Sequence, residues 1–331
     1  MPLGTIVGHG PVVALLRRAV ARGRVPQSLL FAGPSGIGKR TVAIALAQAV
    51  NCPRRTRSGD DGCGACPTCQ RIARGVHSDV VFLDQGDDAS IKIAAVRERV
   101  LDSVGYRPFE AARRVFIIDS ADLLGGEAQD ALLKTLEEPP PSAILILVTA
   151  LADALRPTVQ SRCRRLRFGP LIEPDVARVL VERAGVDRSR ARALAAVSGG
   201  SVGLALALEE GQLDADREAA FALVAAARGR VGDRLKAAAA LAKHDSDRRD
   251  REALGDRLAM VGSILRDLGA VAAGREGQLA NADRAKDVRA LASAFGLPRV
   301  VAASEALARA QASLARNASP KIVADWIAVA L

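Results

Sequence analysis

The sequence has few aromatic residues and no long apolar run. Among 331 residues there are seven Phe, one Tyr and one Trp, so the chain offers few rings on which nucleic-acid bases stack. No apolar segment approaches the roughly 20 residues that cross a bilayer. Residues 1–10 lack the basic-then-apolar pattern of a signal peptide. We therefore expect a globular, cytoplasmic protein that does not contact a membrane.

Lysine is also scarce, although the chain is basic. Only seven of the 47 basic residues are Lys, and the formal net charge is +10. Clustered basic side chains neutralise nucleic-acid phosphates, but the arginines of this sequence are dispersed. The charge alone therefore leaves direct contact with DNA open.

Short apolar runs alternate with helical stretches from about Pro2 to Phe168. The expected strands are Ser28–Ala32, Asp79–Leu83, Arg114–Ile118, Ala143–Thr149 and Arg165–Phe168. The expected helical segments are Pro11–Ala21, Lys39–Val50, Ile93–Val104, Ala128–Leu136 and a short turn at Arg156–Arg162. This rhythm is typical of an α/β fold with a parallel sheet covered by helices on both faces.

Beyond Phe168 the sequence predicts only helices. Gly169-Pro170 marks a hinge, and we expect a P-loop domain over 1–168, a small helical unit over 169–210 and an all-helical unit over 211–331. In the last helix Pro320 suits the first turn, and the apolar residues Ile322, Trp326 and Val329 fall on one face.

A glycine-rich segment, residues 33–39, stands between the first expected strand and the helix after it. Its glycines are Gly33, Gly36 and Gly38. Such a turn aims backbone N–H groups at phosphates, and Lys39 would reach the outer phosphates. The next position should carry a hydroxyl for magnesium, but it is Arg40; Thr41 is no simple substitute, because one helical residue turns the side chain by about 100°. We predict a degenerate nucleotide site at which binding of ATP or ADP stays open, the alternative being a turn that merely starts a helix.

An acidic residue, Asp119, ends the apolar run Val115–Ile118. It is a candidate for orienting a magnesium shell, and a capped turn at the end of a strand is the alternative. In many relatives of this fold the next residue is a Glu that polarises the attacking water, and here it is Ser120. Efficient hydrolysis at this chain's own site is therefore not expected.

Four of the five cysteines cluster with the spacing C-x10-C-x2-C-x2-C. They are Cys52, Cys63, Cys66 and Cys69. Short spacings of this kind let thiolates close a tetrahedral zinc site. Because the segment lies away from the phosphate loop and has no obvious general base, we predict a structural Zn²⁺. An iron–sulfur cluster and free thiols are the alternatives; His77 is left out of the ligand set, and Cys163 is expected to be a packed residue.

Three stretches resemble the clamp-loader subunits of the AAA+ family. They are Ala131–Pro140, with the sequence ALLKTLEEPP, the segment Pro157–Cys163 ending in Ser-Arg-Cys, and the cysteine cluster followed by His77–Val80. The resemblance spans about Ile6 to Leu208. It implies that Arg162 is an arginine finger that points at the γ-phosphate held by a neighbouring subunit.

Departures from the family pattern select a type within it. A motor subunit of the tau/gamma type should carry a hydroxyl, a Glu and an Arg where this chain has Arg40, Ser120 and Gly203. The chain therefore looks like the delta-prime type of DNA polymerase III, which implies that 169–210 is a lid and 211–331 a collar. The implied partners are tau/gamma and delta subunits, the beta sliding clamp and primed DNA. The alternatives are an active tau/gamma-type ATPase and a zinc-stabilised DNA-binding scaffold with a vestigial P-loop.

Overall fold

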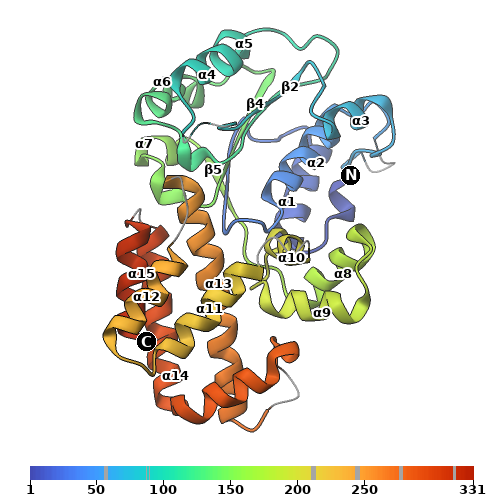
Figure 1. The fold of residues 1–331 in the computed structure, drawn as a ribbon. Coiled ribbons are helices and arrows are strands. Elements are labelled where there is room, and N and C mark those ends of the chain that lie inside the picture. Colours follow the sequence, from blue (N-terminus) through green and yellow to red (C-terminus); the bar gives the residue numbers. More distant parts are fainter. Residues whose placement is uncertain are drawn as a thin grey trace. The chain divides into compact units, whose positions relative to one another are not determined.

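The computed structural model describes residues 1–55, 59–86, 88, 90–209, 214–242, 247–275, 279–315 and 318–331. Residues 56–58 of the cysteine segment and the expected boundary at 210–211 lie outside the described residues. The chain divides into two compact units, Met1–Pro170 and Leu171–Leu331 (Figure 1). The separation of the second unit into a lid and a collar stays a prediction.

The first unit is built on a five-stranded parallel sheet with the order β2-β3-β4-β1-β5. The strands are β1 Ser28–Ala32, β2 Val80–Leu83, β3 Arg114–Ile118, β4 Ala143–Thr149 and β5 Arg164–Arg167. Every residue of the neighbouring strands β1 and β4 is buried, which is why they read as unbroken apolar runs. The expected α/β class with a parallel sheet is confirmed.

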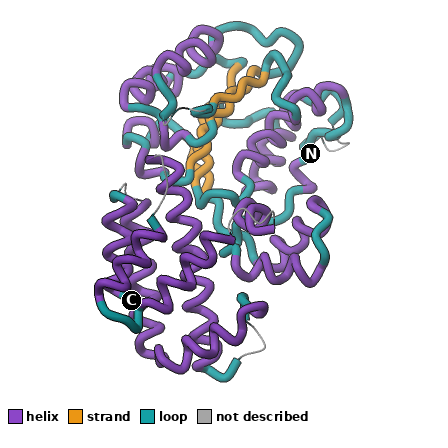
Figure 2. Tube along the Cα trace, in the orientation of Figure 1, coloured by secondary structure: helices purple, strands orange, loops and turns teal. Residues whose placement is uncertain are grey.

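Helices cover both faces of this sheet (Figure 2). They are α1 Gly10–Ala21, α2 Lys39–Asn51, α3 Pro67–Ala73, α4 Ile93–Val96, α5 Asp102–Val104, α6 Gly126–Glu137 and α7 Pro157–Gln160. The expected helix over 93–104 is interrupted by a π-helical turn at Arg97–Leu101. Helix α6 ends because Glu138 precedes a proline and takes a non-helical conformation.

One core of the first unit lies between the sheet and helices α4 and α6. Phe116 and Ile118 of β3 point into it and meet Leu132 and Leu136 of α6. Cys163 packs against the same cluster, and burial raises the pKa of its thiol to about 12. Cys163 is thus a packed residue, as expected.

The described part of the second unit consists of helices joined by short connections. They are α8 Glu173–Ala184, α9 Arg188–Val197, α10 Val202–Glu209, α11 Asp214–Ala226, α12 Val231–Leu241, α13 Asp247–Ala272, α14 Ala285–Ala315 and α15 Pro320–Ala330. Helix α14 is kinked at Gly296, whose φ of 64° is incompatible with a helix, two residues before Pro298.

No single helix in the described ranges is both long and apolar enough to cross a bilayer. Two helices, Ala282–Ser293 and Phe295–Leu314, meet the length and composition criteria only when they are taken together across their 101° bend.

The last helix packs through a different face from the one that its large apolar residues mark. Ile322, Trp326 and Val329 share a face but are 67%, 42% and 54% exposed. The buried face carries Val323 and Ile327 and packs on α12 and α14. Apolar residues lie nearly all around α15, so spacing alone does not decide which side is packed.

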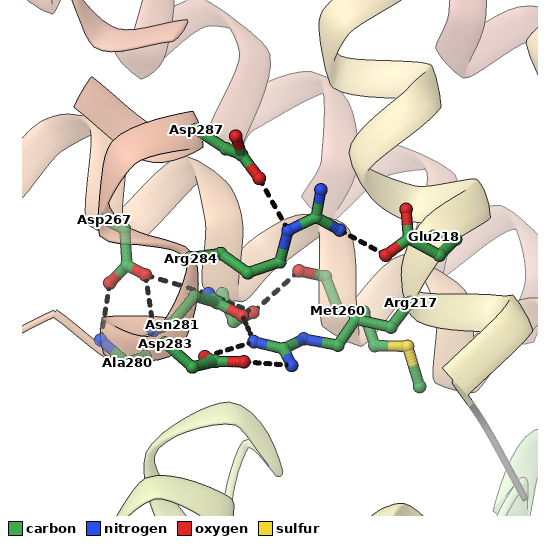
Figure 3. Close-up of polar contacts among 10 residues, drawn as sticks. Arg217, Glu218, Met260, Asp267, Ala280, Asn281, Asp283, Arg284 and Asp287 are labelled. Carbon is green, nitrogen blue, oxygen red and sulfur yellow. Dashed lines mark hydrogen bonds and ion pairs between the residues drawn. The ribbon is translucent and has the colours of Figure 1, made fainter. Parts of the chain in front are cut away.

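A polar network joins the ends of α13 and α14 to α11 in the second unit (Figure 3). The buried carboxylate of Asp267 accepts the backbone N–H groups of Ala280 and Asn281, each at 2.8 Å, and the Asn281 side-chain amide at 2.8 Å. The guanidinium of Arg217 donates to both oxygens of Asp283 at 2.7 Å and to the Asn281 amide oxygen at 3.0 Å. Ala280, Asn281 and Asp283, which precede α14, are therefore held by side chains of α13 and α11.

We expect Asp267→Ala to lower the free energy of unfolding by roughly 3 kcal/mol, because it leaves buried N–H groups without an acceptor. Urea unfolding followed by tryptophan fluorescence measures this, since the single Trp326 lies in the second unit. As a control, Asp287→Ala removes a half-exposed carboxylate that pairs with Arg284 and should cost less than about 1 kcal/mol. Equal losses in the two variants would contradict this role of Asp267.

Candidate nucleotide site and cysteine cluster

The glycine-rich segment forms the turn between β1 and α2, at the carboxyl edge of the sheet. A Cβ on Gly33 would lie 2.1 Å from the Phe168 carbonyl oxygen, so only glycine allows the backbone of the turn to pass β5 so closely. Gly38, the N-cap of α2, has a φ of 97°. Gly36 also has a positive φ, of 70°. His9, which lies outside the turn, contacts the carbonyl oxygen of Ile37 within it through Nε2 at 2.8 Å.

Lys39 is folded back onto its own loop. Its side chain is buried, and Nζ donates to the carbonyl oxygens of Gly33 at 2.7 Å and Pro34 at 2.5 Å. Burial lowers the pKa of Lys39 to about 8, while the charges of Asp119 and Asp122 act in the opposite direction. The ammonium is therefore mostly protonated at neutral pH, and it must leave these carbonyls to reach a phosphate.

Arg40 turns towards the ends of two neighbouring strands. Its Nη1 lies 3.1 Å from Asp119 Oδ2, at the end of β3, and 3.9 Å from Asp84 Oδ2, at the end of β2. Its guanidinium carbon lies 5.8 Å from the centre of the Phe82 ring. Thr41, the next residue, is exposed. The structure thus brings Lys39, Arg40 and Asp119 together at one edge.

Both carboxylate oxygens of Asp119 are engaged. Oδ2 accepts from Arg40, and Oδ1 accepts the backbone N–H of Ser120 at 2.9 Å. Ser120 has a left-handed conformation, with φ 52° and ψ 47°, which is uncommon outside glycine. No general base stands at the position of Ser120, where many relatives of this fold carry a Glu.

Two further acidic residues belong to this edge and were not singled out from the sequence. Asp84 contacts Arg40, and Asp122 acts on Lys39 through its charge while accepting from the Thr149 hydroxyl at 2.8 Å. A signal for Asp84 was present, because it follows β2 directly, as Asp119 follows β3. Loops at the carboxyl ends of parallel strands converge on one binding edge.

The four clustered cysteines lie close enough to hold one metal ion. Their sulfur atoms all lie within 4.8 Å of one another, and the pair Cys52–Cys66 is separated by 3.8 Å. A tetrahedral site with zinc–sulfur distances of about 2.3 Å has sulfur–sulfur edges of about 3.8 Å. Backbone N–H groups of Cys63, Cys66 and Cys69 point at the preceding cysteine sulfurs. The donor set therefore fits a zinc ion.

The thiols of this cluster differ in their protonation. Backbone N–H groups, that of Ala65 first, lower the pKa of Cys63 to about 6, whereas burial raises the pKa of Cys52 and Cys69. Contacts among buried neutral thiols contribute little to stability, whereas a bound cation would stabilise the deprotonated thiolates. His77 is no part of the group: its Nδ1 accepts the Asp79 backbone N–H at 3.1 Å.

Arg162 lies two residues after the end of α7, and its side chain is about one-third exposed. Its Nε and Nη2 contact one oxygen of Glu137, at the end of α6, at 3.3 and 3.2 Å, and Nη1 donates to the Thr158 carbonyl at 3.0 Å. Glu137 belongs to the ALLKTLEEPP segment and is more exposed than Arg162. The two segments that carry the family resemblance therefore meet through this contact.

Comparison with known proteins matches residues 8–172 to the family described as "DNA polymerase III, delta subunit". The DNA polymerase III subunit gamma of Buchnera aphidicola (subsp. Acyrthosiphon pisum) is 33% identical over 175 residues, which are 53% of this chain and 47% of that protein. The subunit tau of Bacillus subtilis is 35% identical over 163 residues, or 49% and 28% of the two chains. The chain spans about half the length of the Buchnera protein and 28% of the Bacillus subtilis protein.

Solved structures that match this chain include a DNA polymerase III gamma-subunit-related protein from Thermotoga maritima. It is 15% identical, with a TM-score of 0.42, over 86% of this chain and 99% of that one. The RuvB Holliday junction branch migration motor of Thermotoga maritima is 19% identical, with a TM-score of 0.42, over 81% and 82% of the two chains.

Purified protein should contain about one zinc ion per chain, and Cys66→Ser should lose most of it, because three thiolates hold zinc less tightly than four. Elemental analysis by mass spectrometry measures the content. Cys163→Ala is the matched control, since it removes the fifth cysteine, which lies outside the cluster. Unchanged zinc in Cys66→Ser would sink the assignment.

Proposed function

We propose, from the match of residues 8–172 to the DNA polymerase III delta-subunit family, that the chain serves as a delta-prime-type subunit of a bacterial clamp loader. In this role it assists the ATP-driven loading of the beta sliding clamp onto primed DNA. It hydrolyses no ATP efficiently itself and supplies Arg162 to the site of an adjacent tau/gamma subunit.

The weakness of the chain's own site carries this proposal. Asp119, the residue expected to orient magnesium, is bound by Arg40 and by the backbone of Ser120. The hydroxyl that would share the metal is replaced by Arg40, and the Glu that would activate water is replaced by Ser120. Gly203, early in α10, stands where a motor would carry an Arg. These differences affect separate requirements of hydrolysis, among them metal binding and activation of water. One compensating contact would therefore not restore ATP hydrolysis.

The environment of Arg162 supports a contribution across an interface. Its guanidinium is exposed in part and meets a carboxylate that water also reaches, and such pairs contribute little to stability. A phosphate from a neighbouring subunit can replace Glu137 at low cost, because a guanidinium binds phosphate oxygens with the same planar set of N–H donors. A fixed guanidinium beside a γ-phosphate stabilises the charge that develops during transfer.

The cysteine cluster fits a structural role in this assembly. Zinc would be held by Cys52, Cys63, Cys66 and Cys69, and the helix that carries Cys69, α3, is tied to the loop before β3 by the Arg71–Glu110 pair at 2.7 Å. A metal at this place would stiffen the surface of the first unit. In the second unit we propose that 169–210 acts as the lid and 211–331 as the collar that holds neighbouring tau/gamma and delta subunits.

An active tau/gamma-type motor is the second candidate, because relatives matched by this chain carry the names gamma and tau. It requires a metal site at Asp119, which Arg40 occupies.

The proposal is tested by reconstituting the chain with tau/gamma and delta subunits, the sliding clamp and primed DNA. Arg162→Ala should slow hydrolysis at the neighbouring site roughly 10³-fold, which is the lower end of the effect of an arginine finger. In single-turnover ATP hydrolysis the phase contributed by that site should be lost, while the phases of the other sites remain.

Arg164→Ala is the control, because it removes an exposed arginine two residues further along the chain. Gel filtration must show that each variant enters the assembly. Normal hydrolysis with Arg162→Ala in an intact assembly would rule out the finger.

A further inference from the structure

Two aspartates end neighbouring strands of the sheet beside the phosphate loop, and one arginine lies against both. Asp84 follows β2 and Asp119 follows β3, and these strands pair directly from Val80–Val115 to Leu83–Ile118. Arg40 Nη1 lies 3.1 Å from the second carboxylate and 3.9 Å from the first. Without Arg40, two carboxylates of like charge would face the phosphate loop with Lys39 as the nearby cation.

The Arg40 guanidinium has the position and the charge of a cation bound by these carboxylates. A divalent ion coordinated by Asp119 would lie close to the Arg40 guanidinium, whose Nη1 is 3.1 Å from Oδ2, and the two positive charges would repel each other. To coordinate Asp119, it would also have to displace the guanidinium from Oδ2. Arginine stays protonated at any physiological pH, so this obstacle is permanent.

We propose that Arg40 is a resident counter-ion that replaces magnesium at this edge, so that a nucleoside di- or triphosphate bound at the phosphate loop is held without a divalent metal. This inference rests on the proposed nucleotide site of the chain and adds its metal requirement. It is separate from the role of Arg162.

Arg40 can bind Asp119 and a phosphate oxygen of the nucleotide at the same time. Its side chain is half exposed, and the Nη1 group accounts for both of its carboxylate contacts. A guanidinium carries five N–H donors in one plane, so others can bind a phosphate oxygen while Nη1 stays on Asp119. Lys39 then supplies the second positive charge to the phosphates once it leaves the carbonyls of Gly33 and Pro34.

The test is a titration of the zinc-loaded full chain with fluorescent ADP, in buffer freed of divalent metals by a chelating resin and again with millimolar magnesium. A soluble chelator is avoided because it would compete for the cysteine site. For the natural chain the affinities in the two buffers should agree within about twofold, whereas magnesium should tighten binding to Arg40→Thr by about fivefold or more. Arg40→Lys, which keeps a cation, should stay independent of magnesium.

Three results would overturn the inference. They are a natural chain whose affinity rises at least fivefold with magnesium, an Arg40→Lys variant as metal-dependent as Arg40→Thr, and no ADP binding by the natural chain in either buffer. Circular dichroism checks that the variants fold, which the exposure of Arg40 favours. Each of these failures leaves the Arg162→Ala result in the assembly unaffected, so the two proposals fail separately.

Discussion

One guanidinium neutralises the acidic side chains at which two neighbouring strands end. In a parallel sheet the loops after the strands meet at one edge. This topology alone brings together the glycine-rich turn, Asp84 and Asp119. Arg40 then determines what this edge can do, because it contacts both carboxylates. The glycine-rich turn lies beside these acidic residues, which are already paired with Arg40.

Two of the arginine–carboxylate contacts in the first unit differ in how far water reaches the carboxylate. Arg40 is bound to Asp119, whose side chain is only one-fifth exposed, whereas Arg162 is bound to Glu137, which is more than half exposed. A carboxylate that water reaches holds a guanidinium weakly. Glu137 is therefore the weaker partner of the two, and this difference supports the separate roles proposed for Arg40 and Arg162.

Much of the first unit followed from the sequence, because the inner strands β1, β3 and β4 are buried on both faces and read as short apolar runs. All five strands were placed within one residue at each end, and the α/β class was right. The prediction of one continuous helix over 93–104 was wrong in detail, because no residue pattern there indicates the π-helical turn at Arg97–Leu101. For α15, residues 320–330, spacing grouped the apolar residues correctly, but the packed face was decided by contacts with α12 and α14.

The candidate site was predictable in its residues but not in its pairings. Motif spacing gave Lys39, Arg40, Asp119 and the four cysteines, and the structure brings these groups together as two clusters. The contact of Arg40 with Asp84 and that of Arg162 with Glu137 link residues far apart in the sequence. Such contacts depend on how side chains leave their elements, which motif spacing does not contain.

The most direct test is ATP hydrolysis by the isolated zinc-loaded chain in the presence of magnesium. Lys39→Ala is the control for contaminating ATPases, because it removes the lysine of the phosphate loop. Both proteins should show the same background rate. Steady turnover that disappears with Lys39→Ala would show a working ATPase and contradict the claim that the catalytic contribution of this chain is made across an interface.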